Sequence, residues 1–186
     1  MSHGGVYHPR AKGGAMSDAL ADARQALNRL IRMLALRGAG LLLVIAAAAA
    51  LLALVSYSAD DPSLNNANLR DAANWLGPVG AVAADELLQA LGIAAVFALL
   101  PLMVWGARAL RGKSLKHAMW RAVAWPLGAM MTAAGLGLLP APERLPAGFG
   151  GWVGIAATHL SANAASVWHQ SWVSWALPLA LLLTGL

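Results

Sequence analysis

The sequence predicts an all-α, polytopic membrane protein with four transmembrane helices and with both termini in the cytoplasm. Three windows, residues 38–59, 87–107 and 122–142, contain no Asp, Glu, Lys or Arg, and each has the ~20 residues that cross ~30 Å of hydrocarbon. The composition agrees, because 59% of the residues are hydrophobic and 11% are charged, whereas soluble domains carry roughly 25% charged residues. A fourth charge-free stretch covers residues 145–186.

Basic residues gather in two blocks that predict the orientation of the chain. Residues 1–37 and 108–121 together hold eleven of the thirteen Lys and Arg residues, whereas residues 60–86 hold five acids and one Arg. Because Lys and Arg collect on the cytoplasmic side of a bilayer, the two basic blocks are expected inside and residues 60–86 outside. The net charge of +5 therefore reflects topology and does not indicate direct DNA binding by this segment.

The residues before the first span divide into two predicted parts. Residues 1–16 are rich in Gly and lack an apolar period, so a disordered cytoplasmic tail is expected. Residues 17–37 repeat Leu and Ile at helical spacing with Arg on another face, which predicts a basic amphipathic helix with Ser17 as its N-cap. Such a helix is expected to lie on the anionic inner leaflet; the alternative is a partner-binding helix.

The membrane domain is predicted to extend over residues 38–186. Its first span is expected to be an uncleaved signal anchor, because it is too long for a signal-peptide core and begins after 37 residues. One proline falls in each of the three later spans, at Pro101, Pro126 and Pro178, and each is expected to kink its helix. The predicted spans are residues 38–57, 82–107, 120–140 and 172–186, with outer loops at 58–81 and 141–171 and an inner loop at 108–119.

The segment 148–167 lies in a charge-free stretch but is more polar than a lipid-facing helix. It contains Thr158, His159 and Asn163, so it is interpreted as an outer interfacial or re-entrant segment. In the alternative, this segment crosses the membrane as a fifth span and the C-terminus lies outside. The chain stops inside its last apolar run without a basic flank, and it is interpreted as the front end of a longer protein.

No catalytic residue, cofactor site or metal site is predicted in this chain. Residues 106–114 read GARALRGKS, but a phosphate-binding loop needs four residues between its glycines and must follow a strand. His159 and His169 lack the spacing of a metal pair, and there is no cysteine for a thiolate ligand or nucleophile. Asp85 and Glu86 are expected to reach for water at the outer boundary; the alternative is a proton relay in a small transporter or channel subunit.

Three short motifs occur in an order that points to a family. They are LVSYSADDPSL at residues 54–64, WLGPVGA at 75–81 and GGWVG at 150–154. With these motifs, residues 37–186 resemble the N-terminal four-helix membrane domain of the FtsK/SpoIIIE family of bacterial DNA translocases. The residues selected as topology or interface candidates are Ser56, Asp61, Pro62, Gly77, Pro78, Gly80, Asp85, Gly150, Gly151 and Gly154.

The resemblance implies a function in bacterial division. It implies a multi-pass anchor in the inner membrane at the septum, which contacts the lipid bilayer, assembles with other cell-division proteins and forms a homo-oligomer. A cytoplasmic motor that uses ATP and Mg²⁺ would move chromosomal DNA during segregation, and DNA would be contacted only through that motor, none of whose residues occur here. The alternatives are a small transporter or channel subunit and a membrane scaffold without a motor.

Overall fold

The computed structural model describes residues 12–113, 117–140, 145, 147–168 and 173–185. Parts of the predicted tail and of the loops 108–119 and 141–171 therefore lie outside the described residues. The described residues form six helices and no strand, which confirms the all-α class. The helices are α1 (Lys12–Val55), α2 (Gly77–Leu91), α3 (Ala94–Leu110), α4 (Ala118–Leu136), α5 (Gly151–Trp168) and α6 (Val173–Gly185).

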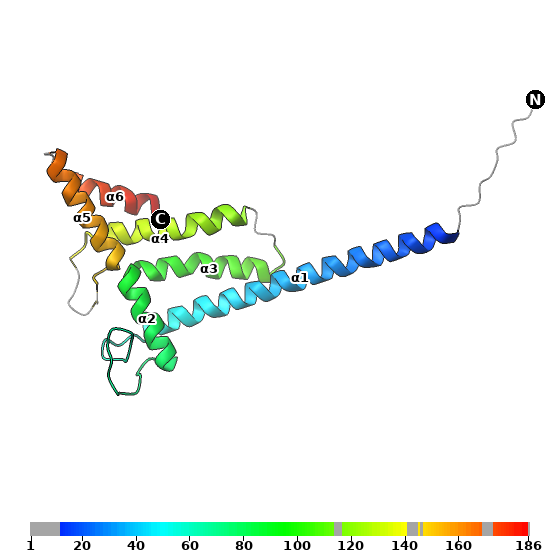
Figure 1. The fold of residues 1–186 in the computed structure, drawn as a ribbon, viewed down its shortest axis with the longest axis horizontal. Helices are drawn as coiled ribbons and strands as arrows, with labels where there is room; N and C mark the ends of the chain where they lie inside the picture. The colour runs from blue at the N-terminus through cyan, green and yellow to red at the C-terminus, as the bar shows by residue number, and fades with distance from the viewer. Residues whose placement is uncertain (1–11, 114–116, 141–144, 146, 169–172, 186) are drawn as a thin grey trace, which may run out of the picture.

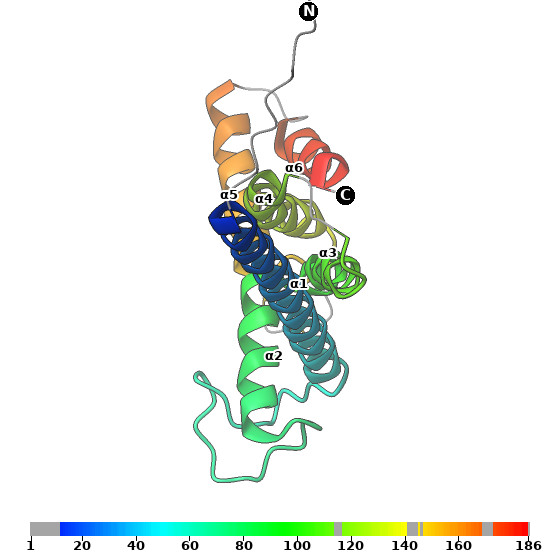
Figure 2. The same ribbon diagram turned by 90° about the vertical axis from the view of Figure 1, so that its right-hand side faces the viewer.

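Four of the helices run side by side, and the other two cross their ends. The C-terminal half of α1, then α3, α4 and α6 follow the long axis of the molecule, and α3 and α4 lie in the middle of this row (Figure 1). Helices α2 and α5 run across one end of the row, as the view along α1 also shows (Figure 2). We call this end, with residues 56–76, the loop end. The opposite end, with the turn between α3 and α4, is the basic end.

Helix α1 is longer than expected. The sequence suggested a tail to residue 16, a separate helix from Ser17 to Arg37 and then a span, but one helix runs from Lys12 to Val55. Ser17 lies inside this helix and is not its N-cap. No proline interrupts residues 12–55, and their Ala and Leu favour continuous helix, so nothing in the chain separates the amphipathic part from the apolar part.

Residues 82–107, predicted as one span kinked at Pro101, are divided between two helices instead. Helices α2 and α3 meet at an angle of 111° across a short break. Gly92 ends α2 with a φ of 60°, and the N–H of Ile93 donates to the carbonyl oxygen of Phe149 at 2.9 Å. A positive φ is accessible to glycine at little cost, so Gly92 permits the bend and the backbone of Phe149 holds it.

The helices of the row pack through close contacts between small residues. A Cβ on Gly40 of α1 would lie 2.7 Å from the carbonyl oxygen of Gly106 in α3, and a Cβ on Gly185 of α6 would lie 2.8 Å from the amide nitrogen of Thr132 in α4. Neither distance leaves room for a side chain. Glycine at both crossings thus lets the backbones approach, as in membrane helix pairs.

Helices α3 and α4 are joined by a hydrogen bond near a proline. The indole N–H of Trp125 in α4 donates to the carbonyl oxygen of Ala98 in α3 at 2.6 Å. Pro101 lies inside α3 and removes one helical hydrogen bond. The Trp125 contact therefore ties α4 to the weakened turn of α3 and accounts for a tryptophan away from the helix ends.

By length and apolarity, α1 qualifies as a membrane span, and the bent pair of α2 and α3 qualifies as a second if it is counted as one span. Helices α4, α5 and α6 occupy most of residues 120–140, 148–167 and 172–186.

Residues 106–110 belong to α3, so the resemblance of residues 106–114 to a phosphate-binding loop is not matched by the conformation of that segment.

Candidate functional site

The loop at residues 56–76 folds back onto the end of α1 through a buried carboxylate. Asp61 accepts hydrogen bonds from the N–H groups of Ala73 at 2.8 Å and Asn74 at 2.9 Å, and it is 6% exposed. A buried carboxylate is tolerated when it is hydrogen-bonded. Asp61 thereby holds the start of the loop against the end of the loop at Ala73 and Asn74.

Asn74 caps the C-terminal end of α1. Its side-chain amide donates to the carbonyl oxygens of Ala53 at 2.8 Å and Ser56 at 3.2 Å, and its Oδ1 accepts from the N–H of Leu76 at 3.1 Å. The last carbonyls of a helix have no partner within the helix, so Asn74 satisfies groups that the end of α1 would otherwise leave open. Asn74 is not among the residues predicted from the sequence, although an Asn shortly before Gly77 and Pro78 is typical of a turn.

Ser56 connects the same two segments. Its hydroxyl donates to the carbonyl oxygen of Leu52 at 2.8 Å and accepts from the N–H of Trp75 at 3.2 Å. Ser56, Asp61 and Asn74 therefore form one group, which we call the loop clamp. The structure brings together two of the residues predicted from the sequence and adds the third.

The turn into α2 is built on the loop clamp. The N–H of Gly77 donates to the carbonyl oxygen of Asn74 at 2.8 Å, and Gly77 has a φ of 66°. Pro78 occupies the first turn of α2, where its missing N–H costs nothing. A side chain on Gly80 would collide with the side chain of Asn74. Pro62, which was also selected from the sequence, is half-buried beside Asp61.

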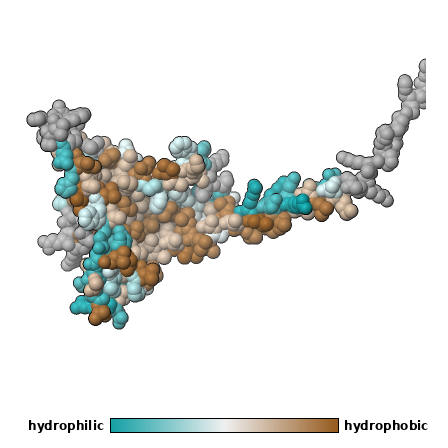
Figure 3. Space-filling view, in the orientation of Figure 1, coloured by the Kyte–Doolittle hydropathy of each residue, from teal (hydrophilic) through white to brown (hydrophobic). Residues whose placement is uncertain are grey.

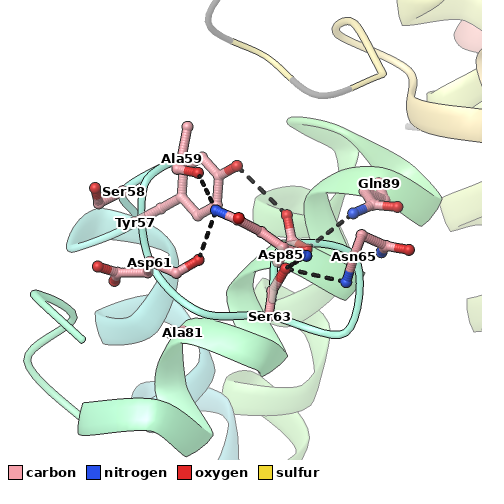
Figure 4. A pocket seen from close by; sticks show the side chains of 10 residues that line it. Tyr57, Ser58, Ala59, Asp61, Ser63, Asn65, Ala81, Asp85 and Gln89 are labelled. Carbon is pink, nitrogen blue, oxygen red and sulfur yellow. Dashed lines mark hydrogen bonds between the residues drawn. The ribbon is translucent and has the colours of Figure 1, made fainter. Parts of the chain in front are cut away.

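Asp85 joins α2 to the loop. Its carboxylate accepts from the Tyr57 hydroxyl at 3.4 Å and from the Gln89 amide at 2.8 Å, and both groups point toward it in Figure 4. Asp85 is 7% exposed whereas Glu86 is exposed. The expectation that both acids reach for water is therefore wrong for Asp85, because the loop covers it.

Tyr57 lies beyond the end of α1, and its hydroxyl donates the hydrogen bond to Asp85. Burial first, and then the negative charge and hydrogen bond of Asp85, raise the pKa of Tyr57 from 10.0 to about 12. The phenol therefore keeps its proton throughout the physiological range and donates it to the carboxylate.

An open pocket of about 230 Å³ lies between this part of the loop and α2. Side chains from the start of the loop face side chains from α2 across it (Figure 4). Among the described residues, no group of three or more His, Asp or Glu is arranged to hold a metal ion. The lining residues are Tyr57, Ser58, Ala59, Asp61, Ser63, Asn65, Asn66, Ala81, Asp85 and Gln89.

The other end of α2 meets a second group of predicted residues. A Cβ on Gly150 would lie 2.7 Å from the amide nitrogen of Gly137, and one on Gly154 would lie 2.9 Å from the Cα of Gly137 at the end of α4. Gly151 has a φ of 60° and abuts the backbone of Ala90. We call Gly92, Gly137, Gly150, Gly151 and Gly154 the glycine junction, where α2, α4 and α5 meet.

Helix α2 thus connects the two groups of candidate residues, with the loop clamp at its start and the glycine junction at its end. The clamp consists of the buried side chains of Asp61 and Asn74 and the half-buried side chain of Ser56, which close the loop. The junction consists of backbones in close contact. Neither contains a nucleophile with a neighbouring base. The arrangement holds α2 and α5 across the ends of the other helices (Figure 1).

Apolar helices that run side by side, with a polar loop and two crossing helices at one end, define a membrane-embedded helical region. Residues 32–186 match the family model described as the 4TM region of DNA translocase FtsK/SpoIIIE. The chain belongs to this family, as the three sequence motifs indicated.

Several relatives support the assignment, and each is a DNA translocase FtsK. That of Agrobacterium fabrum is 40% identical over 125 residues, which cover 66% of this chain and 14% of the relative. That of Rhizobium meliloti is 39% identical over 118 residues (62% and 13%), and that of Mesorhizobium japonicum is 34% identical over 136 residues (72% and 14%). The chain thus spans about a seventh of the length of these relatives. No solved structure matches it.

Proposed function

We propose that this region anchors a septal DNA translocase in the bacterial inner membrane and helps to assemble the cell-division machinery. The observation that carries the proposal is the family match over residues 32–186, together with relatives that are DNA translocases. In this proposal, an ATP- and Mg²⁺-dependent motor outside these residues moves chromosomal DNA during segregation. The role of the described residues is to hold that motor at the membrane.

The proposed topology has four spans, made by α1 from Gly38 onward, by α3, by α4 and by α6. Two observations support it: these helices run side by side (Figure 1), and the basic residues of α1 and of the α3–α4 turn gather at the basic end. By the positive-inside rule the basic end is cytoplasmic. Helices α2 and α5 then lie along the outer face of the membrane, and both termini are inside.

The loop end is the proposed surface for other division proteins. Its loop carries exposed apolar side chains at Leu64, Leu69 and Trp75, which are 75%, 107% and 69% exposed. Apolar residues on an ordered loop are a common means of binding another protein. The loop clamp would act indirectly, because it fixes the shape in which the loop presents these residues.

A small transporter or channel subunit would need Asp85 to exchange protons along a path through the membrane. The contacts of Asp85 support an architectural role instead, since it accepts from Tyr57 of the loop and from Gln89 one turn further along α2. A scaffold without a motor shares the anchoring role proposed here and differs only in what the rest of the protein contains.

Fluorescent fusions of residues 1–186 in dividing cells test the proposal. The protein should resist alkaline extraction from membranes and should collect at the division site. The double variant Asp61→Asn, Asn74→Ala should remain in the membrane but lose its enrichment at the septum, whereas Asp60→Asn, at an exposed neighbouring position, should retain it. Uniform envelope fluorescence of the unmodified chain would contradict the septal role, and release by alkali would contradict anchoring.

A further inference from the structure

The N-terminal half of α1 projects from the basic end without a partner helix. Helix α1 packs only on α2 and α3 among the described helices, and from Met16 to Ala39 every residue is exposed except Leu36, which is half-buried. Figure 3 shows hydrophobic residues along one side of this projecting half and hydrophilic residues along the other. An apolar stripe of this kind is stable in water only when something covers it.

The stripe has the period of a coiled-coil seam. Leu20, Leu27 and Leu34 recur every seven residues, and Met16, Ala23 and Leu30 fall between them at alternating spacings of four and three. Alternating apolar residues at these spacings give the 3.5-residue period at which helices wrap around each other. The leucines are 56–59% exposed and Leu30 is 47% exposed, so the whole seam is available for contact.

Polar residues occupy the side away from the seam. They are Asp18, Asp22, Gln25, Asn28, Arg29 and Arg32. Of the positions that flank the seam, one side holds Ala19, Ala26 and Met33 and the other holds Ser17, Arg24 and Ile31. In a parallel pair in register, Arg24 therefore faces alanine of the partner, and no like charges oppose each other across the seam.

The continuity of α1 determines which partner fits. The helix passes from the projecting half into the apolar half without a break, so every copy inserted with the same orientation carries a parallel helix that starts at the same height. A neighbouring copy thus supplies the matching seam in register, at the high effective concentration that tethering gives. A lipid surface would instead require the helix to turn aside near Arg37, where it is continuous.

We infer that residues 16–34 of α1 pair with the same residues of a second copy of this chain in a parallel coiled coil on the cytoplasmic side of the membrane. The inference rests on the proposed membrane anchoring, which supplies the common orientation. It names the surface through which the homo-oligomer expected from the sequence would form. A helix of this length is only marginally stable alone in water. Tethering to the membrane is therefore needed for the pairing, because it holds two such helices close together.

Single-cysteine crosslinking of the full chain in native membranes tests the inference, because the chain has no cysteine of its own. Leu27→Cys and Leu34→Cys place a thiol on the seam, and Gln25→Cys and Arg32→Cys place one on the opposite side. Under mild oxidation, the two seam variants should give several-fold more disulfide-linked dimer than the two controls. The further variant Leu27→Asp, combined with Leu34→Cys, should abolish the dimer while the protein stays in the membrane fraction.

Two results would overturn the pairing. Equal dimer yields at all four positions would show random collision, and seam thiols that are shielded from a water-soluble maleimide but give no dimer would show that the stripe lies on lipid. Loss of the unmodified chain from the membrane fraction would count against the anchoring proposal instead. The membrane fraction is measured in the same samples, so the two failures are distinguishable.

Discussion

Asn74 and Asp61 are buried where an apolar helix gives way to a loop, and each has its hydrogen-bonding groups satisfied by backbone. Asp61 fixes the N–H groups of the returning chain, and Asn74 fixes the last carbonyls of α1. Buried polar groups contribute little net stability when paired but cost much when a partner is removed. Single residues at the loop end are therefore more sensitive to substitution than their position outside the apolar helices suggests.

Asn74→Ala should destabilise the protein by about 1–3 kcal/mol, because it removes the buried amide that donates to the carbonyl oxygens of Ala53 and Ser56. The measurement is the midpoint of thermal unfolding in detergent micelles. Asn65→Ala, at an exposed position of the same loop, is the matched control and should leave the midpoint nearly unchanged. Identical midpoints for both variants would show that Asn74 does not cap α1.

Asp85→Asn should lower the pKa of Tyr57 from about 12, because the negative charge and the charged acceptor are both removed. A phenol whose pKa is raised by folding contributes stability that is complete below pH 10.0 and is lost as the pH rises through about 12. Phenolate absorbance in a Tyr7→Phe background isolates Tyr57, since the chain has two tyrosines.

Glu86→Gln is the control for this titration, because Glu86 is exposed whereas Asp85 is buried. It should leave the Tyr57 titration in place. A titration curve that Asp85→Asn does not move would exclude the contact between the loop and α2.

At the scale of elements, the decisive feature is the break between α2 and α3. The sequence predicts apolar helix on both sides of Gly92, but one glycine is tolerated inside helices, and the backbone that holds the bend comes from Phe149, far along the chain. The bend was therefore not predictable from local pattern. The continuity of α1 differs from the prediction for the opposite reason. The composition changes at Arg37, which predicts a boundary, but no residue there ends the helix.

The features that could be predicted are those that depend on residue types close together in the sequence. The charge-free windows indicated the helices, and the motifs indicated Ser56, Asp61, Gly77 and Gly80, which the structure gathers around one turn. Asn74 was missed because its partners, Ala53 and Ser56, are backbone groups distant in sequence. The glycines at 150, 151 and 154 were selected, but their neighbours in α2 and α4 were not evident without the fold.

Gly92→Ala should destabilise the protein, and Gly38→Ala should not. A Cβ on Gly92 meets the carbonyl of Phe149 at a positive φ, whereas one on Gly38 meets no atom within 4 Å. Overpacking costs about 1–3 kcal/mol, and alanine inside a helix gains roughly 0.5–1 kcal/mol over glycine. Unfolding midpoints of the two variants should therefore shift in opposite directions, and a shared direction would rule out the tight bend.

At the scale of the whole molecule, the helices form three parts with different positions. The row of α1, α3, α4 and α6 provides the apolar body, α2 and α5 brace its loop end, and the projecting half of α1 extends from the basic end (Figures 1 and 3). This division fits an anchor that presents one surface to the outside and another to the cytoplasm. It also separates the two proposals, because the proposed septal enrichment would depend on the loop end and the proposed pairing would depend on the projecting half.

The most direct test of the account is the labelling of single cysteines by a membrane-impermeant maleimide, in cells whose inner membrane is intact or opened. Cysteines in place of Leu69, Ala90, Ala147 and Ala162 should label from outside, because the proposed topology puts α2 and α5 on the outer face. Lys113→Cys should label only after the inner membrane is opened. Labelling of Ala147→Cys and Ala162→Cys from opposite sides would require a fifth crossing, and an unreactive Ala90→Cys would place α2 within the bilayer; either result would contradict the account.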